Sequence, residues 1–358
     1  MRSDIVVAGG GLVGLSCAAA LAARGATVAV VSSRRPGEAS PAAAGMLAPS
    51  VEAVPGLAHE FALAARDRYP SWVATITEAT GMGFSLDRSG ILQLALDDDE
   101  ASRLRVSLSA PSRWVNEAEV RKMEPGVGEN SGAVFHPDDG WVDNTALLRA
   151  LRAMLAKQSL VSIFENEEVT AIRAAGTHVS VSTTSGAIAE AGQLVIAAGA
   201  WSAGIRGQST TLPLKPVRGQ MLSVNLRLIS HVIFGPSGYV VPRSALTFAG
   251  STMEDVGFHS SATPEGRSSI IVSATRLCPA FSHHAIASHW AGLRPMTPDG
   301  LPILCRDDVQ DRVIYACGHS RNGILLAPVT ADCVAAMANG EDPPYDLSPF
   351  SNKRFSNL

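Results

Sequence analysis

Two arginines in glycine- and proline-rich segments are the side chains of this sequence best suited to chemistry. Arg294 lies in the string GLRPMTPDGLP, and Arg321 lies in the string GHSRNGIL. A guanidinium group keeps its positive charge and offers a planar fork that matches a carboxylate. Two such forks in turns before an apolar helix indicate the capture of a small anionic substrate beside a cofactor.

The other groups that could do chemistry give weaker signals. His283, His284 and His289 invite a metal site, but no cysteine or carboxylate completes a ligand set, so we expect no metal. The five cysteines include no Cys-x-x-Cys pair, which favours a reducing compartment. A net charge of −4 without a basic stripe argues against nucleic-acid binding.

The location of the protein is predicted from its apolar segments. The run Ile5–Ala8 near the N-terminus is too short for the core of a signal peptide. We find no uninterrupted apolar stretch long enough to cross a bilayer, so no membrane contact is expected. The sequence therefore predicts a cytoplasmic protein.

The elements that position these arginines begin with a nucleotide-binding pattern. Residues 5–8 are apolar and typical of a buried strand, residues 12–24 are rich in alanine and leucine and predict a helix, and residues 27–31 predict a second strand. Between the first strand and the helix, Gly9 permits a tight turn, Gly11 lets backbone approach a pyrophosphate, and Gly14 allows close helix packing. We expect a dinucleotide on the positive end of this helix.

The end of the second predicted strand departs from the dinucleotide pattern. An Asp or Glu usually holds the adenosine ribose there, whereas this sequence has Ser32, followed by Ser33, Arg34 and Arg35. The arginines could accept the 2′-phosphate of NADP, which leaves an NADP-dependent reductase as an alternative. In the other interpretation, Ser32 bonds the ribose and both arginines are solvated.

Further strings point to a flavin. AAAGMLAP at 42–49, GWVD at 140–143, LVIAAGAWS at 194–202 and PVRGQM at 216–221 join the arginine strings. With this set, nearly the whole chain resembles the D-amino-acid-oxidase-like FAD-dependent oxidoreductases. The resemblance implies non-covalent FAD and hydride transfer from a small amino acid to flavin N5. Molecular oxygen would be the acceptor, and the products would be an imine or glyoxylate, ammonia and hydrogen peroxide.

The substrate and acceptor stay open within this family. Glycine is the favoured substrate, with sarcosine and small D-amino acids as alternatives, and the resemblance implies a role in thiamine thiazole synthesis. A dehydrogenase of the same fold that passes electrons to a quinone or carrier is an alternative, as is an FAD-binding protein without activity. A homo-oligomer is also possible.

The resemblance assigns roles to named residues. The substrate would meet Arg294, Arg321, Tyr239 and Met253, with Arg294 pairing with its carboxylate, and no protein acid or base is expected. Arg294 could instead bond backbone carbonyls, and Tyr239 and Met253 could be plain packing. FAD would contact Gly9, Gly11, Leu12, Val13, Gly14, Ser32, Ser33, Ser40, Ala44, Gly45, Met46, Val169, His319, Ser320, Arg321, Asn322, Gly323, Ile324 and Leu325. Ser320 stands where relatives often carry a tyrosine, which could enlarge the space near Arg321.

The chain of 358 residues is long enough for two domains, and an α/β fold is predicted. A Rossmann-type FAD-binding domain is expected to combine residues 1–80, 140–213 and 288–358. Residues 81–139 and 214–287 would form an α+β substrate domain on an antiparallel sheet. Its expected strands include 219–224, 239–242 and 246–251. The acidic run 97–100 is expected at the N-terminal end of a helix.

Overall fold

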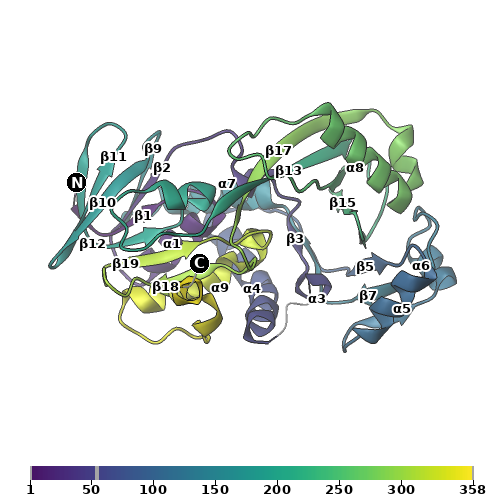
Figure 1. Ribbon diagram of the computed structural model, residues 1–358, viewed down its shortest axis with the longest axis horizontal. Coiled ribbons are helices and arrows are strands. Elements are labelled where there is room, and N and C mark those ends of the chain that lie inside the picture. The colour runs from purple at the N-terminus through teal and green to yellow at the C-terminus, as the bar shows by residue number, and fades with distance from the viewer. Residues whose placement is uncertain (1, 53–55, 357–358) are drawn as a thin grey trace.

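The computed structural model describes residues 2–52 and 56–356, which are built around two eight-stranded sheets (Figure 1). The first sheet has the order β10-β11-β12-β1-β2-β9, and β19 joins it beside β12 and carries β18. Its strands β12, β1, β2 and β9 run parallel, as does β19 beside β12. The strands are β1 Arg2–Ala8, β2 Val28–Ser32, β9 Val161–Glu165, β10 Val169–Ala175, β11 His178–Thr183, β12 Ile188–Ile196, β18 Ile303–Arg306 and β19 Val313–Cys317.

The two faces of the first sheet are covered differently because successive side chains of a strand point to opposite sides. Val7 and Val30 pack into a core with the helices, whereas Val6 and Val31 pack against β10 and β11. The helices are α1 Leu12–Ala23, α4 Leu57–Thr80, α7 Asn144–Ala156 and α9 Gly323–Ala338. This arrangement confirms the predicted strand, turn and helix around the glycine string.

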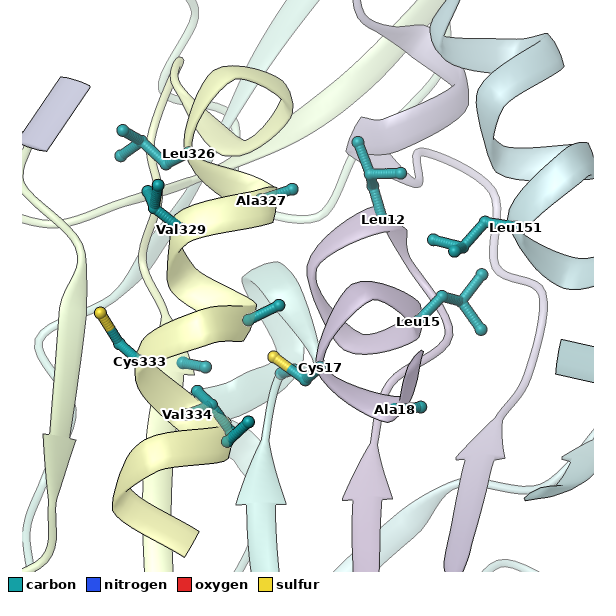
Figure 2. Close-up of a cluster of buried hydrophobic side chains, with 14 of the residues drawn as sticks. Leu12, Leu15, Cys17, Ala18, Leu151, Leu326, Ala327, Val329, Cys333 and Val334 are labelled. Carbon is teal, nitrogen blue, oxygen red and sulfur yellow. The ribbon is translucent and has the colours of Figure 1, made fainter. Parts of the chain in front are cut away.

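Helices α1 and α9 lie side by side on the parallel strands, as Figure 2 shows. Their contact is rich in small side chains, and Cys17 of α1 points toward α9 (Figure 2). Burial raises the pKa of the Cys17 thiol well above its ordinary value and that of Cys333 to about 12, so both stay protonated. They act as small apolar residues in this contact.

The second sheet lies opposite the first across the cavity described below. Its order is β17-β13-β16-β15-β14-β5-β7-β6, with α8 Pro264–Leu277 packed on it. The strands are β5 Ile91–Leu94, β6 Arg113–Val115, β7 Ala133–His136, β13 Lys215–Val224, β14 Val232–Gly235, β15 Gly238–Arg243, β16 Leu246–Gly250 and β17 Ile286–Met296. The three strands expected at 219–251 are therefore present.

Two details of this sheet differ from the prediction. The sheet is not purely antiparallel, because β5 pairs with β14 in parallel. Such a pair needs a long crossover connection, and here the chain passes through the first sheet between the two strands. In addition, β17 belongs to the second sheet over its whole length, although residues 288–296 were expected in the FAD domain.

A small third sheet forms separately from the two large ones. It has the order β3-β8-β4, formed by β3 Met46–Leu47, β8 Gly140–Val142 and β4 Leu86–Asp87. The remaining elements are α2 Ala39–Ala42, α3 Pro49–Glu52, α5 Asp98–Val106, α6 Glu117–Met123, η1 Gly199–Gly204, η2 Pro279–His283, η3 Ser348–Phe350 and η4 Asn352–Phe355. As predicted, the acidic run starts α5, where the Asp97 side chain accepts the Glu100 N–H. Among the described residues, no helix is long and apolar enough to cross a membrane.

Candidate active site and cofactor cavity

A cavity of about 770 Å³ lies between the first sheet and the second. One wall is the glycine turn after β1, and the opposite wall includes Gly219, Met221 and Tyr239 of the second sheet. The cavity lies at the carboxyl ends of β1 and β2, which is where open α/β sheets bind their ligands. The cavity is lined by all predicted site residues except Gly14 and Leu325.

The three glycines of the turn after β1 differ in their surroundings. A Cβ atom on Gly9 would lie 2.3 Å from the Ala197 carbonyl oxygen, and one on Gly14 would lie 2.0 Å from the Gly9 carbonyl oxygen. These two glycines therefore serve the packing of the turn itself. A Cβ on Gly11 would approach only the Ser40 hydroxyl, at 3.2 Å, so the space above Gly11 is open for a ligand.

The N-terminal end of α1 faces this open space. Gly11 is its N-cap and brings no side chain, so the positive end of the helix is left to the cavity. The Leu12 N–H donates to the Ser40 hydroxyl at 2.9 Å, which places Ser40 beside the turn. This arrangement suits a pyrophosphate.

The segment around Gly45 is held between the sheets by an arginine that sequence reasoning missed. The buried Arg243 guanidinium donates to the Ala44 carbonyl at 2.8 Å, to Asn144 Oδ1 at 2.9 Å and to Asp143 Oδ1 at 2.8 Å. A Cβ on Gly45 would lie 2.1 Å from the Val142 carbonyl oxygen. Arg243 thereby holds Ala44 and Gly45, which line the cavity, against the end of β8.

Arg294 is half-buried in the cavity wall. Its Nη1 donates to the Thr252 carbonyl at 3.1 Å, and its Nη2 donates to the Ser251 hydroxyl at 2.6 Å. A guanidinium has five N–H donors, so these two bonds orient Arg294 and leave others for a ligand. Ser251 and Thr252 were not predicted, because they lie more than 40 residues from Arg294 in sequence.

Tyr239 and Met253 also line the cavity but differ in exposure. The half-buried Tyr239 stacks with Phe234 at 6.2 Å between ring centroids, and its hydroxyl lies 3.3 Å from Met221 Sδ. Met253 is 55% exposed, so it lies at the mouth rather than in the core. Both placements are compatible with the predicted contacts to a small substrate.

Arg321 reaches the cavity from its rim. Its Nη2 forms an ion pair with Glu52 Oε2 at 2.5 Å, and half of its side chain is exposed. The neighbouring Ser320 is buried and lines both this cavity and a second one of about 370 Å³. Of these two arginines, Arg294 is the one that has no carboxylate partner in the described structure. A contact between Arg321 and the substrate stays a prediction.

The segment that leads into α9, residues 318–322, closes the far side of the cavity. His319 is buried, and its Nε2 lies 3.1 Å from the Thr330 hydroxyl. Burial lowers the pKa of His319 to about 4, so the ring is neutral near pH 7. Helix α9 then starts at Gly323 and directs its positive end toward the cavity, while Leu325, which was expected to contact FAD, packs in the core behind it.

The other end of the cavity is lined by Ser32, Ser33, Arg35 and Val169. Arg35 pairs there with Glu168, and Arg34 lies outside the cavity lining. The two arginines that suggested NADP are thus paired or turned elsewhere. Among residues 2–52 and 56–356, no cluster of His, Cys, Asp or Glu could hold a metal ion.

The residues of the cavity fit FAD. The open space above Gly11, the N-terminal end of α1 and the cavity of about 770 Å³ leave room for a pyrophosphate with a ring system on each side. Arg294 and Tyr239 then lie at one end and Ser32 and Ser33 at the other. The class defined by this fold and site is a flavin-dependent oxidoreductase.

Comparison with known proteins agrees. A family model described as FAD dependent oxidoreductase matches residues 4–337, and the chain belongs to this family. It is 36% identical to the glycine oxidase of Bacillus licheniformis, over 95% of this chain and 94% of that protein. The crystal structure of glycine oxidase from Geobacillus kaustophilus superposes with a TM-score of 0.91 at 31% identity, covering 98% of both chains.

The first curated relatives are longer proteins. The chain is 36% identical to the bifunctional protein ThiO/ThiG of Trichormus variabilis, over 99% of this chain but 55% of that protein. It thus spans about half their length. The family confirms the predicted fold class and FAD as the cofactor and decides against the NADP alternative.

Proposed function

We propose that this protein oxidises glycine, or an amino acid of similar size, to an imine with FAD as the hydride acceptor. The observation that carries the proposal is Arg294, a guanidinium oriented by Ser251 and Thr252 in the wall of the cavity that fits FAD. The glycine oxidases among the relatives support the choice of substrate.

Recognition of the substrate follows from the donors that line the cavity. Arg294 binds the carboxylate, since a guanidinium matches both oxygens with parallel N–H bonds. In the described structure the only partner of the Tyr239 hydroxyl is the thioether of Met221, and a thioether is a weak acceptor. The hydroxyl can therefore turn and donate to the carboxylate of the substrate instead. Met221 and Phe234 bound the space beside Tyr239 with apolar surface, which favours a small side chain or none.

The chain contributes positioning rather than proton transfer. His319 is neutral and bonded to Thr330, so it does not supply a general acid near pH 7. When bound, FAD supplies the hydride acceptor for the α-carbon. Arg294 and Tyr239 fix the amino acid by its carboxylate, which holds the α-carbon in a reactive orientation. The imine leaves for solution, where water converts the part that no other enzyme consumes to glyoxylate and ammonia.

The acceptor, pathway, assembly and location belong to the same proposal. We infer that molecular oxygen takes up the two electrons and two protons as hydrogen peroxide. The ThiO/ThiG names support a supply of the imine to thiamine thiazole synthesis. A cytoplasmic location and a homo-oligomer remain predictions, which fractionation and light scattering would test.

The test is an anaerobic visible spectrum of the FAD-loaded protein before and after adding glycine. Loss of the oxidised flavin bands, followed by peroxide formation in air, is the expected result. If the flavin bands bleach but no peroxide forms in air, the electron acceptor is a quinone or a carrier protein rather than oxygen. A spectrum unchanged by glycine, sarcosine and D-alanine would overturn the proposal.

A further inference from the structure

The end of β2 lacks the acidic side chain that dinucleotide-binding folds place there. Ser32 is the last residue of β2, and it is half-buried beside Gly10. In such folds a carboxylate at this point holds the hydroxyls of the adenosine ribose. A serine hydroxyl is a weaker partner for a ribose hydroxyl than a carboxylate, so a carboxylate from another segment would strengthen the binding of the ribose.

A glutamate from a different part of the sheet lies at this end of the cavity. Glu168 belongs to the turn between β9 and β10, directly before Val169, and both residues line the cavity. The Glu168 carboxylate accepts hydrogen bonds from the Ser33 hydroxyl and from Arg35 Nε, so it is tied to the two residues that follow Ser32. Its side chain is 23% exposed, which leaves it accessible from the cavity.

Arg35 is held in place on both sides. It forms an ion pair with Glu168, and its guanidinium carbon lies 5.2 Å from the ring centroid of Trp201. The indole face attracts the cation, and the carboxylate neutralises it. Arg35 therefore orients Glu168, and an incoming 2′-phosphate would face the carboxylate rather than a free arginine.

We propose that Glu168 is the ribose-binding carboxylate of this protein, supplied by the β9–β10 turn in place of the second strand. A carboxylate accepts about four hydrogen bonds, so Glu168 can bind Ser33, Arg35 and a ribose hydroxyl together. It selects FAD over any ligand with a phosphate on that ribose, because two negative charges repel there. The proposal depends on the flavin cofactor and not on the substrate, so a failure with glycine would leave it standing.

The test measures flavin binding to the apoprotein without any turnover. Apoprotein is titrated with FAD and, separately, with FMN, which lacks the adenosine half, and flavin fluorescence reports binding. For E168Q and E168A, we expect the Kd for FAD to rise by about 10- to 100-fold, the loss expected for a hydrogen bond to a charged group. The Kd for FMN should stay within about twofold of wild type, because FMN has no adenosine ribose for Glu168 to contact.

A neighbouring glutamate provides the matched control. Glu167 carries the same charge one residue earlier and also lines the cavity, but its carboxylate accepts from the Thr184 hydroxyl and the Ser185 N–H instead of from Ser33 and Arg35. E167Q should bind FAD as wild type does. A rescue variant, S32E in the E168A background, returns the carboxylate to the second strand and should recover most of the lost affinity. Unchanged FAD binding by E168A, or equal weakening for FAD and FMN, would overturn the proposal.

Discussion

A Cβ atom on Gly219 would lie 2.2 Å from Nη1 of Arg294. Gly219 is in β13 and Arg294 in the neighbouring β17, where Gly219 pairs with Gly292. The guanidinium lies over the bare backbone of Gly219, which leaves it room in the cavity wall. The glycine of the PVRGQM string thus leaves space for the Arg294 guanidinium in the cavity wall.

Replacing Gly219 by alanine should displace the Arg294 guanidinium without disturbing FAD. Under the proposed function, G219A should raise KM for glycine by about tenfold, the loss of one charged hydrogen bond. Steady-state kinetics and the flavin spectrum would measure the two effects. The control is G83A, because a Cβ on the exposed Gly83 meets no atom within 4 Å. An unchanged KM for G219A would show that Arg294 tolerates the methyl group.

Replacing Arg294 by lysine tests the planar fork separately from its charge. R294K keeps the positive charge but loses the parallel N–H donors, so KM for glycine should rise by about tenfold. R294A, which loses both, should raise it further while FAD stays bound. Kinetics with glycine and a flavin titration would check this order. Wild-type kinetics for R294A would remove Arg294 from the substrate site.

The loop that positions Arg294 depends on a mostly buried ion pair. Arg218 Nε donates to Glu254 Oε2 at 2.6 Å, and Arg218 Nη1 donates to the Ser261 carbonyl at 2.8 Å. Since Gln220 also donates to Glu254, the loop after β16 is tied to β13. R218M should lower the free energy of unfolding by about 3 kcal/mol, because it strands the Glu254 charge. Urea unfolding of the apoprotein would measure the loss.

Two comparisons separate the ion pair from general damage to the loop. The double variant R218M/E254M should recover part of the stability, because neither charge is then left alone. The pair of Lys215 with Asp255 attaches the same loop but is exposed on both sides, so K215M should cost no more than about 1 kcal/mol. A K215M loss equal to that of R218M would contradict this account.

Two buried histidines should make the apoprotein less stable in mild acid. Burial lowers the pKa of both His136 and His319 to about 4 from an ordinary 6.5. Between pH 6.5 and pH 4 these two imidazoles are therefore protonated in the unfolded chain but remain neutral in the folded chain. Each histidine then removes about 1.4 kcal/mol of stability per pH unit as the pH falls. Above pH 6.5 their contribution is constant.

Unfolding curves for H136Q and H319Q between pH 7 and pH 4 would check the slope. Each variant should lose less stability on acidification than the wild type. H178Q is the matched control, because half-exposed His178 lies beside Glu190 at 4.0 Å on the surface. Parallel curves for wild type and both buried-site variants would rule out the histidines as the source.

The parts predicted from sequence are those built from neighbouring residues. The strand, glycine turn and helix at 5–24 can be recognised because their period and their turn glycines are local. The strands near 219–251 were found for the same reason. The extent of β17 was not, because its pairing with β13 across a long loop decides which sheet it joins.

Residues that act across the fold left little signal in the sequence. Arg243 and Glu168 are ordinary charged residues until the chain brings them against the turns that line the cavity. Ser32 was recognised as a departure, but its compensation lies 136 positions away by the difference of residue numbers. For Arg321, the partner Glu52 could not be anticipated from the arginine string.

The interleaving of the chain between the two sheets limits how the protein can be divided. Residues 2–32 start the first sheet, and residues 91–136 build the far edge of the second. Residues 161–196 return to the first sheet before the chain crosses over again at β13. A single cut would therefore sever strands from their sheet on at least one side. Neither sheet can therefore be exchanged as one contiguous segment. A change of specificity in this fold is instead made by substitutions of single residues that line the cavity.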